Sequence, residues 1–327
     1  MTNPEIEPGA AGTERASLAG LASSDQAAPA APRSPQTLSK GLLREARPKQ
    51  WVKNVLVFAA PGAAGALTHL HPLLVTIGTF GVFCLAASGT YFVNDAMDVA
   101  ADRSHPTKRY RPIAAGVVPL PLAWAVGLGL LLAGVGLSYA LAGADLTIVV
   151  ASYVAITLAY SAFLKHEAVL DLAAVAAGFL LRAIAGGVAV HVPLSDWFVI
   201  VASFGSLFMV AGKRYAEHRD LGEARSGHRA TLATYSLGFL RYVRSLSSAV
   251  AIAAYCLWAF EKARPAGGAA IWFELSIAPF VLAILRYALL LDAGQGAAPE
   301  EVVLSDRTLQ LLGVAWILLF AFGVYGL

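Results

Sequence analysis

The stretch VNDAMDVAADRSHPTKRYRPIAAG, residues 93–116, stands between two long apolar runs. Three aspartates, Asp95, Asp98 and Asp102, lie near its start, and several basic residues follow them. Acidic residues this close to a membrane-length apolar run are costly unless the protein uses them. The flanking runs therefore predict membrane-spanning helices, and the aspartates indicate where the chemistry takes place.

The composition supports a membrane protein. The 327 residues are 57% hydrophobic and 14% charged, whereas about a quarter of the residues in soluble domains are charged. Cys84 and Cys256 both lie inside apolar runs, which argues against a disulfide framework or a zinc site. A formal net charge of +3 is too small to indicate a nucleic-acid partner. These features predict an all-α integral membrane protein that does not bind nucleic acid.

Nine segments are long and apolar enough to cross a bilayer, which takes about 20 residues each. The first is the weakest, because it is short and contains Pro61. We therefore predict a bundle of nine transmembrane helices. The predicted spans are residues 54–70, 73–94, 118–142, 145–163, 168–190, 196–212, 237–260, 271–291 and 308–326.

The loop charges predict the orientation of this bundle. Lys and Arg are concentrated in the second-to-third and sixth-to-seventh connections, and Lys165 lies in the fourth-to-fifth. The alternate connections GALTHLHP, LAGAD and AVHVPLSDW contain neither residue, and only Lys262 and Arg264 break the pattern. By the positive-inside rule the N-terminus is inside and the C-terminus outside. The aspartates then face the cytoplasm from the plasma (inner) membrane.

The region before the first span divides into two parts. Residues 1–38 are rich in Ala, Pro, Ser and Gly, which predicts a disordered tail. Residues 39–53 are basic and amphipathic, which predicts an interfacial helix on the anionic cytoplasmic leaflet. Residues 54–327 would then form the catalytic domain.

The spacing of the aspartates points to a metal. Positions three to four apart share a helix face, so Asp95, Asp98 and Asp102 can line one side of a helix end. Carboxylates so placed repel each other unless a cation lies among them, and hard oxygen ligands suit Mg²⁺. The alternative is a solvated helix end with ordinary acidic residues. We predict that all three are catalytic residues and ligands of Mg²⁺.

Two motifs resemble those of the UbiA-type intramembrane prenyltransferase superfamily. NDAMDVAAD (residues 94–102) fits its NDxxDxxxD motif, which also follows the second of nine helices. YSAFLKH (residues 160–166) is similar to its YPxxKR element, with Ser161 in place of proline. The resemblance covers roughly residues 45–327. It implies a nine-helix fold with a cytoplasmic-face cavity in which Mg²⁺ is held on a diphosphate.

One departure from the superfamily pattern concerns its second acidic motif, DxxYAxxD. The chain keeps Tyr-Ala at 215–216 but has Gly212 and Arg219 in place of the aspartates. Lys213 and Arg214 stand beside them. Because Lys and Arg bind phosphate directly, this change predicts a phosphate site where relatives have a metal site.

These features resemble one branch of the superfamily, which transfers 5-phosphoribose from phosphoribosyl pyrophosphate to decaprenyl or another polyprenyl phosphate. The product of that branch leads to the lipid-linked arabinose donor of the cell wall. The resemblance implies that polar and basic residues near the aspartates bind the two substrates. They are Gln50, Lys53, Asn94, Lys108, Arg109, Arg111, Tyr160, Lys165, Lys213 and Arg214.

Several questions stay open at this level. A Mg²⁺-dependent prenyltransferase using a prenyl diphosphate is one alternative, and an anion transporter is another, although transporters place charge near the midplane. Glu167 and Asp171, four residues apart, could be a relocated acidic pair. Arg182, inside an apolar run, has no assigned role. The acceptor chain length, its double-bond geometry and the number of Mg²⁺ ions are also open, and a homo-oligomer is compatible with the sequence.

Overall fold

The computed structural model describes residues 37–221, 230–293 and 299–326, and every element in these ranges is a helix. The predicted disordered tail lies outside the described residues except for its last two positions. In chain order the elements are α1 (Leu38–Glu45), η1 (Pro48–Phe58), α2 (Ala59–Ala63), η2 (Ala66–Thr68), α3 (Leu70–Met97), α4 (Val99–Ser104), η3 (Lys108–Tyr110), α5 (Leu120–Ala162), η4 (Leu164–His166), α6 (Leu170–Ala189), α7 (Asp196–Leu221), α8 (Ala230–Thr234), α9 (Leu237–Ala263), η6 (Gly267–Ala269), α10 (Ala270–Asp292), α11 (Pro299–Ser305) and α12 (Arg307–Tyr325).

Seven helices in the described part of the chain are long and apolar enough to cross a membrane. They are α3, α5, α6, α7, α9, α10 and α12. Their limits lie close to the spans predicted from the sequence, except that the predicted third and fourth spans are joined in α5. The prediction of an all-helical membrane bundle is therefore confirmed, but the first predicted span, residues 54–70, is not among the seven helices.

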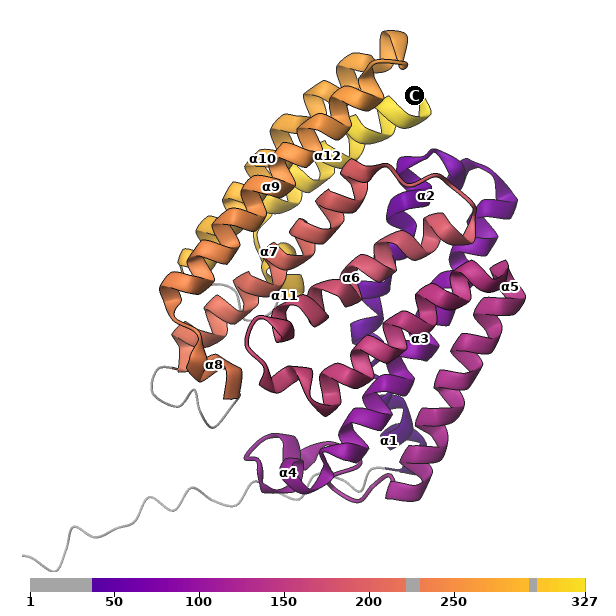
Figure 1. Cartoon of the computed structure of the whole chain (residues 1–327), viewed down its shortest axis with the longest axis vertical. Coiled ribbons are helices and arrows are strands. Elements are labelled where there is room, and N and C mark those ends of the chain that lie inside the picture. The colour runs from indigo at the N-terminus through magenta and orange to yellow at the C-terminus, as the bar shows by residue number, and fades with distance from the viewer. Residues whose placement is uncertain (1–36, 222–229, 294–298, 327) are drawn as a thin grey trace, which may run out of the picture. The chain divides into compact units, whose positions relative to one another are not determined.

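The 43-residue helix α5 contains a break where the sequence predicts a loop. Ala142 and Gly143 have non-helical backbone angles, and Gly143 has a φ of 72°. Glycine adopts this left-handed φ without the steric cost that a Cβ would bring. Across the break, the Ser138 and Thr147 hydroxyl oxygens lie 3.2 Å apart. The chain folds back at this point, so that α5 consists of two arms (Figure 1).

The region of the predicted interfacial helix and first span differs from an ordinary pair of α-helices. The helix predicted over residues 39–53 ends at Glu45, and an 11-residue 3₁₀ helix, η1, starts at Pro48. Between them Arg47 has a left-handed backbone, with a φ of 52° and a ψ of 58°. Pro48 explains the break, because proline has no N–H to donate and disfavours the right-handed helical conformation in the residue before it.

The 3₁₀ geometry gives η1 three distinct faces. With three residues per turn, positions three apart lie above one another. Asn54, Val57 and Ala60 are buried, whereas Lys49, Val52 and Val55 are exposed. A 3₁₀ helix rises about 2.0 Å per residue and an α-helix about 1.5 Å, so η1 and α2 together extend about 30 Å. Sixteen residues can therefore match the thickness of a bilayer's hydrocarbon core.

Two glycines of α6 allow η1 and α2 to pack closely against it. A Cβ on Gly186 would lie 1.8 Å from the Val57 carbonyl oxygen, and one on Gly187 would lie 2.9 Å from the Ala60 Cβ. No side chain fits at position 186 without moving the backbone. Small residues that let helix backbones approach are typical of membrane-protein interfaces.

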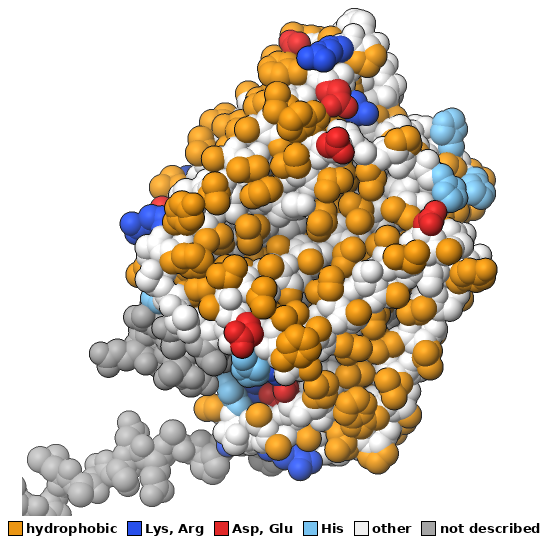
Figure 2. Space-filling model, viewed as in Figure 1, with side chains coloured by type: hydrophobic (Ala, Val, Ile, Leu, Met, Phe, Trp, Pro, Cys, Tyr) orange, Lys and Arg blue, Asp and Glu red, His pale blue; other side chains and the backbone are white. Residues whose placement is uncertain are grey.

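The outside of the described bundle suits a bilayer. Figure 2 shows a broad face of hydrophobic side chains, with most charged side chains near its margins. Leu70, Leu132 and Leu311, on α3, α5 and α12, are all more than two-thirds exposed. Apolar surface on this scale is unfavourable in water and favourable against lipid.

Candidate active site

The predicted metal motif lies where α3 gives way to α4. Helix α3 ends at Met97, Asp98 has the non-helical angles φ −88° and ψ 7°, and α4 begins at Val99. Asp95 and Asp102 are buried, whereas the Asp98 side chain is 30% exposed. The change in backbone angles therefore falls at the middle one of the three carboxylates. Among the described residues, no group of three side chains is arranged as a ready-made metal site.

Each carboxylate of the motif is instead paired with a basic side chain. Arg47 donates to Asp95 Oδ2. Arg111 Nη1 donates to Asp95 Oδ1 at 3.0 Å and to Asp102 Oδ2 at 2.8 Å. Lys165 Nζ lies 2.9 Å from Asp98 Oδ1 and 3.2 Å from Oδ2. We call these six residues the motif cluster: Arg47, Asp95, Asp98, Asp102, Arg111 and Lys165.

Two residues of this region, Arg47 and Glu45, were not predicted from the sequence. Arg47 contacts Asp95, and its guanidinium lies 4.6 Å from the centre of the Tyr91 ring. Glu45 is buried behind it, 3.8 Å from Arg47. Burial and the neighbouring Asp95 carboxylate raise the pKa of Glu45 to about 8, so this side chain largely keeps its proton at neutral pH. Arg47 opens the basic segment RPKQWVKN (residues 47–54), but a segment of this kind does not identify the partner of each basic residue.

The other predicted ligands near the motif are spread around it. The Asn94 amide donates to Asp95 at 3.1 Å, and Lys53 donates to Gln50 at 2.5 Å along one face of η1. Arg109 is exposed and lies over the Tyr110 ring, 4.9 Å from its centre. Lys108 is half-buried at the start of η3. Asn94, Arg111 and Lys165 thus contact the carboxylates of the motif, whereas Arg109 lies on the exposed surface against Tyr110.

A second charged cluster occupies the region of the replaced acidic motif. Arg214 Nε lies 3.2 Å from Asp171 Oδ2, and Arg214 Nη1 lies 3.0 Å from Glu217 Oε2. The Tyr235 hydroxyl donates to Asp171 and accepts the Val169 backbone N–H at 2.6 Å. Burial and the bond to Asp171 raise the pKa of Tyr235, so it stays neutral. We call Asp171, Arg214, Glu217 and Tyr235 the anchor cluster.

The anchor cluster contains two residues that the sequence marks as candidates for binding. Arg214 was predicted to bind phosphate, but its guanidinium is buried against two carboxylates, and its Nη2 lies 3.4 Å from the Tyr160 hydroxyl. Asp171 was considered as part of a relocated acidic pair, but it is fully buried against Arg214. Lys213 is more exposed, with Glu217 at 3.9 Å.

The positions that carry aspartates in the superfamily motif now pack against α10. A Cβ on Gly212 would lie 2.7 Å from the Leu291 Cδ1 atom. Arg219 donates to the Asp292 carbonyl at the end of α10. Cations at a helix C-terminus satisfy free carbonyls and oppose the helix dipole. Helix packing has replaced the acidic side chains at both positions.

Thr231 links the two clusters through the η4 turn. Its hydroxyl lies 3.5 Å from the Lys165 carbonyl oxygen and 3.4 Å from Asp171 Oδ2. The Lys165 side chain meanwhile reaches Asp98. The anchor cluster therefore fixes the backbone of the turn that presents Lys165 to the motif.

Arg182, whose role the sequence left open, is held by neutral partners inside the bundle. Its Nε donates to Asn54 Oδ1 at 2.7 Å, its Nη2 to the Tyr153 hydroxyl at 2.7 Å and its Nη1 to the Gly178 carbonyl at 2.8 Å. The guanidinium also lies 4.5 Å from the centre of the Tyr153 ring. It ties η1 to α5 and α6, a structural role in keeping with the cost of an unsatisfied charge in a membrane.

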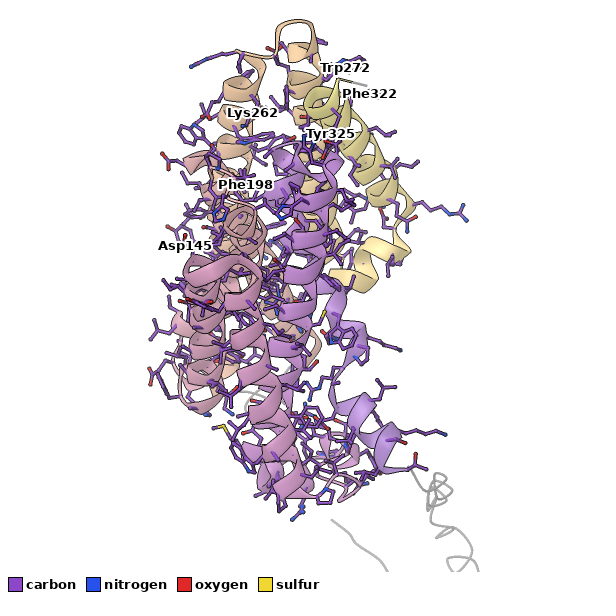
Figure 3. The ribbon with its side chains drawn as sticks, turned by 90° about the vertical axis from the view of Figure 1, so that its right-hand side faces the viewer. Asp145, Phe198, Lys262, Trp272, Phe322 and Tyr325 are labelled. Atoms are coloured by element: carbon purple, nitrogen blue, oxygen red, sulfur yellow. The ribbon has the colours of Figure 1, made fainter. Side chains whose placement is uncertain are left out.

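The other end of the bundle is built from aromatic rings. Trp272 on α10 lies 5.2 Å from the Phe322 ring on α12, and the Tyr325 hydroxyl donates to the Gly62 carbonyl at 3.2 Å. Figure 3 labels these aromatic residues near one end of the ribbon, together with Lys262. The paired charges of the motif lie at the end of α3 beside α4, so the candidate chemistry belongs to that end.

Comparisons with known proteins agree with this geometry. The chain matches the model of the UbiA prenyltransferase family over residues 55–312. It is 47% identical over 296 residues to the decaprenyl-phosphate phosphoribosyltransferase of Corynebacterium glutamicum, covering 89% of each chain. It is 48% identical over 293 residues to the protein of that name in Mycolicibacterium smegmatis, covering 86% of this chain and 92% of the relative.

A solved structure shares the fold. A UbiA homologue from Archaeoglobus fulgidus bound to DMAPP and Mg²⁺ superposes with a TM-score of 0.66 at 16% identity, over 88% of this chain and 100% of the other. Fold and site together define a multi-pass membrane transferase. The chain belongs to the UbiA prenyltransferase family.

Proposed function

We propose that the protein transfers 5-phosphoribose from phosphoribosyl pyrophosphate to decaprenyl phosphate or a related polyprenyl phosphate, with release of diphosphate. The high identity to two decaprenyl-phosphate phosphoribosyltransferases over most of both chains supports this reaction. The observation that favours this reaction over prenyl transfer is the replacement of the second acidic motif, DxxYAxxD. Gly212 packs against Leu291, and Arg219 caps α10, so neither position offers a carboxylate to a second metal.

The arrangement in the membrane is part of this proposal. The two arms of α5 count as two crossings, and the η1–α2 segment is long enough to be a further one, which together with the other six helices gives nine. The loop charges then place the N-terminus and the motif cluster on the cytoplasmic side of the plasma membrane and the C-terminus outside. Phosphoribosyl pyrophosphate would reach the site from the cytoplasm, and the lipid acceptor from the bilayer.

The donor set of the motif cluster fits a magnesium ion. Asp95 and Asp102 supply hard carboxylate oxygens, and Arg111 Nη1 already lies within hydrogen-bond distance of both, which shows that a positive charge is accepted between them. Mg²⁺ prefers oxygen ligands of this kind and often bridges to substrate phosphates. Asp95, Asp98 and Asp102 would hold it, after their basic partners have moved aside.

The chemistry requires little proton transfer. The bond between ribose C1 and the diphosphate breaks, and an oxygen of the acceptor phosphate forms the new bond to C1. A phosphate monoester, with a second pKa of about 6, is already mostly dianionic at neutral pH, so no general base is needed. When bound, Mg²⁺ supplies positive charge to the leaving diphosphate. The protein's task is positioning and charge stabilisation.

Basic residues around the motif cluster would bind the remaining phosphates. Arg111 and Lys165 are only partly buried and can turn from carboxylates to phosphate oxygens. Lys108, Lys213, Gln50, Lys53 and Tyr160 extend this basic and polar surface, with Asn94 supporting Asp95. Arg214, held in the anchor cluster, would act by positioning Tyr160 and η4.

A transfer assay tests this function. The full-length protein, purified in detergent, is incubated with radiolabelled phosphoribosyl pyrophosphate, Mg²⁺ and decaprenyl phosphate. A parallel reaction contains geranyl diphosphate and an aromatic acceptor. We expect labelled lipid in the first reaction, lost on chelation of the metal, and no product in the second. Prenyl transfer, or failure to use phosphoribosyl pyrophosphate, would contradict the proposal.

A further inference from the structure

Arg47 occupies an unexpected place for a residue outside the motif. It donates to Asp95 Oδ2, while Arg111 donates to Oδ1 of the same carboxylate. Both oxygens of the most buried carboxylate in the motif are therefore covered by guanidinium groups. These two guanidinium groups oppose the binding of a divalent cation to Asp95, because like charges a few ångströms apart repel strongly in a partly buried site.

The backbone at Arg47 is fixed while its side chain is accessible. Its left-handed φ of 52° is uncommon for a residue with a Cβ, and such conformations persist where the surroundings enforce them. Arg47 lies between helix α1, which packs through Gly41 against Val118, and Pro48, which starts η1. The Arg47 side chain, however, is 28% exposed. It can exchange one anionic partner for another without any movement of the helices.

The next polar groups lie on η1 beside Arg47. Gln50 and Lys53 are three residues apart, so they share one face of the 3₁₀ helix, about 6 Å apart along its axis. Both are half-buried, and the Lys53 ammonium donates to Gln50 Oε1. This face of η1, which follows directly after Arg47 in the chain, is thus polar and partly basic, as a bound diphosphate requires.

We propose that Arg47 is an exchange residue, which neutralises Asp95 while the site is empty and binds the diphosphate of the donor once Asp95 ligates the metal. This rests on the proposed function, since it assumes a metal and a diphosphate in the site. Arg47 then opposes binding of the metal alone and favours binding of the diphosphate. Metal and diphosphate then bind cooperatively. The metal takes the place of Arg47 at Asp95 and leaves the guanidinium unpaired, and the diphosphate pairs with that guanidinium.

This role predicts opposite effects of one substitution on two ligands. Arg47→Gln removes the competitor for Asp95, so the metal alone should bind more tightly. It also removes a charge-assisted contact to phosphate, so the diphosphate should bind more weakly. A permanent structural ion pair predicts something else: unchanged or weaker metal binding, with diphosphate binding unaffected.

Two binding measurements on the full-length protein in detergent separate these cases. Mn²⁺ replaces Mg²⁺, and free Mn²⁺ is followed by electron paramagnetic resonance without any phosphate. Binding of inorganic diphosphate at saturating Mn²⁺ is followed by calorimetry. For Arg47→Gln we expect Mn²⁺ affinity to rise about ten-fold and diphosphate affinity to fall roughly ten- to a hundred-fold, the range for a charge-assisted hydrogen bond. Arg44→Gln, the same change on the exposed side of α1, should alter neither.

Two further variants keep the test decisive. Arg47→Lys retains the charge and should give smaller changes in the same directions, which covers the case that Arg47→Gln does not fold. Asp95→Asn should abolish Mn²⁺ binding, so that the signal of free Mn²⁺ stays at its level without protein. Loss of both affinities in Arg47→Gln, no change in either, or an Asp95→Asn variant that binds Mn²⁺ normally would each overturn the proposal. Neither measurement contains ribose or lipid, so failure of phosphoribosyl transfer would be seen separately, in the transfer assay.

Discussion

The motif cluster and the anchor cluster both join carboxylates to basic side chains, but they differ in their access to solvent. In the motif cluster the basic partners Arg47 and Arg111 are each 28% exposed and Lys165 is 24% exposed. In the anchor cluster Arg214 is 4% exposed and Asp171 is fully buried. The first set of ion pairs can be opened by an incoming ligand, and the second cannot be opened without unpacking helices.

This contrast separates binding from architecture. In the motif cluster the basic partner is exposed enough to turn to water or to a ligand, although Asp95 and Asp102 themselves are buried. Removing one member of a buried pair leaves an uncompensated charge in a medium of low polarity. The basic residues of the motif cluster are therefore accessible from solvent, whereas Arg214 and Asp171 join α6 to α7 inside the bundle.

The largest effect is expected at the motif. Asp95→Asn should lower the transfer rate about a thousand-fold, since a metal ligand contributes several kcal/mol of charge stabilisation in the transition state. Its thermal unfolding temperature should change little, because the freed arginines are partly exposed and can be hydrated. Transfer assays and thermal unfolding of the same preparation give both values. Near-normal activity would remove Asp95 from the site.

Asp171→Asn should show the reverse pattern, with a large loss of stability and little loss of donor binding. Loss of this carboxylate leaves Arg214 buried with only Glu217 as an acidic partner, and we expect the free energy of unfolding to fall by about 3–5 kcal/mol. Molecules that remain folded should retain most of their affinity for phosphoribosyl pyrophosphate. Thermal unfolding measures the first effect and donor binding the second. A stable Asp171→Asn variant that cannot bind donor would place Asp171 in the binding site instead.

Lys165 tests the connection between the clusters. Lys165→Ala should reduce kcat/KM roughly ten- to a hundred-fold, because a charge-assisted phosphate contact is lost. Lys165→Arg retains the charge and should recover part of the activity. Thr231→Val, which removes the hydroxyl near the Lys165 carbonyl, should have a smaller effect in the same direction. Equal kcat/KM in Lys165→Ala and the wild type would argue that this lysine only neutralises Asp98.

The smallest effect is expected at Arg109, which is exposed over Tyr110. Arg109→Gln should lower kcat/KM only about two- to three-fold, through weaker electrostatic attraction of the anionic donor. The difference from the wild type should disappear at high ionic strength, because salt screens exposed charges. A deficit of ten-fold or more that persists in high salt would indicate direct contact with phosphate.

The sequence and the structure agree best where local rules suffice. The limits of α6 and α10, the break at Gly143 and the position of the motif at the end of α3 were all predictable. The 3₁₀ geometry of η1 was not, because helix type within a short apolar segment depends on what it packs against. Here the contacts are Gly186 of α6 against Val57 and Arg182 against Asn54.

The sequence by itself determined the membrane class, the spans from α3 onward and the place of the aspartate motif at the end of α3. A membrane span must satisfy its backbone hydrogen bonds within its own helix, so length and apolarity reveal it locally. Only the tertiary structure decided which charges meet. Arg47 and Asp95 are 48 residues apart, Lys165 and Asp98 are 67 apart, and Arg214 and Asp171 are 43 apart. Helix packing sets these pairings and their burial, so it also decides which basic residues are accessible to a substrate and which hold the bundle together.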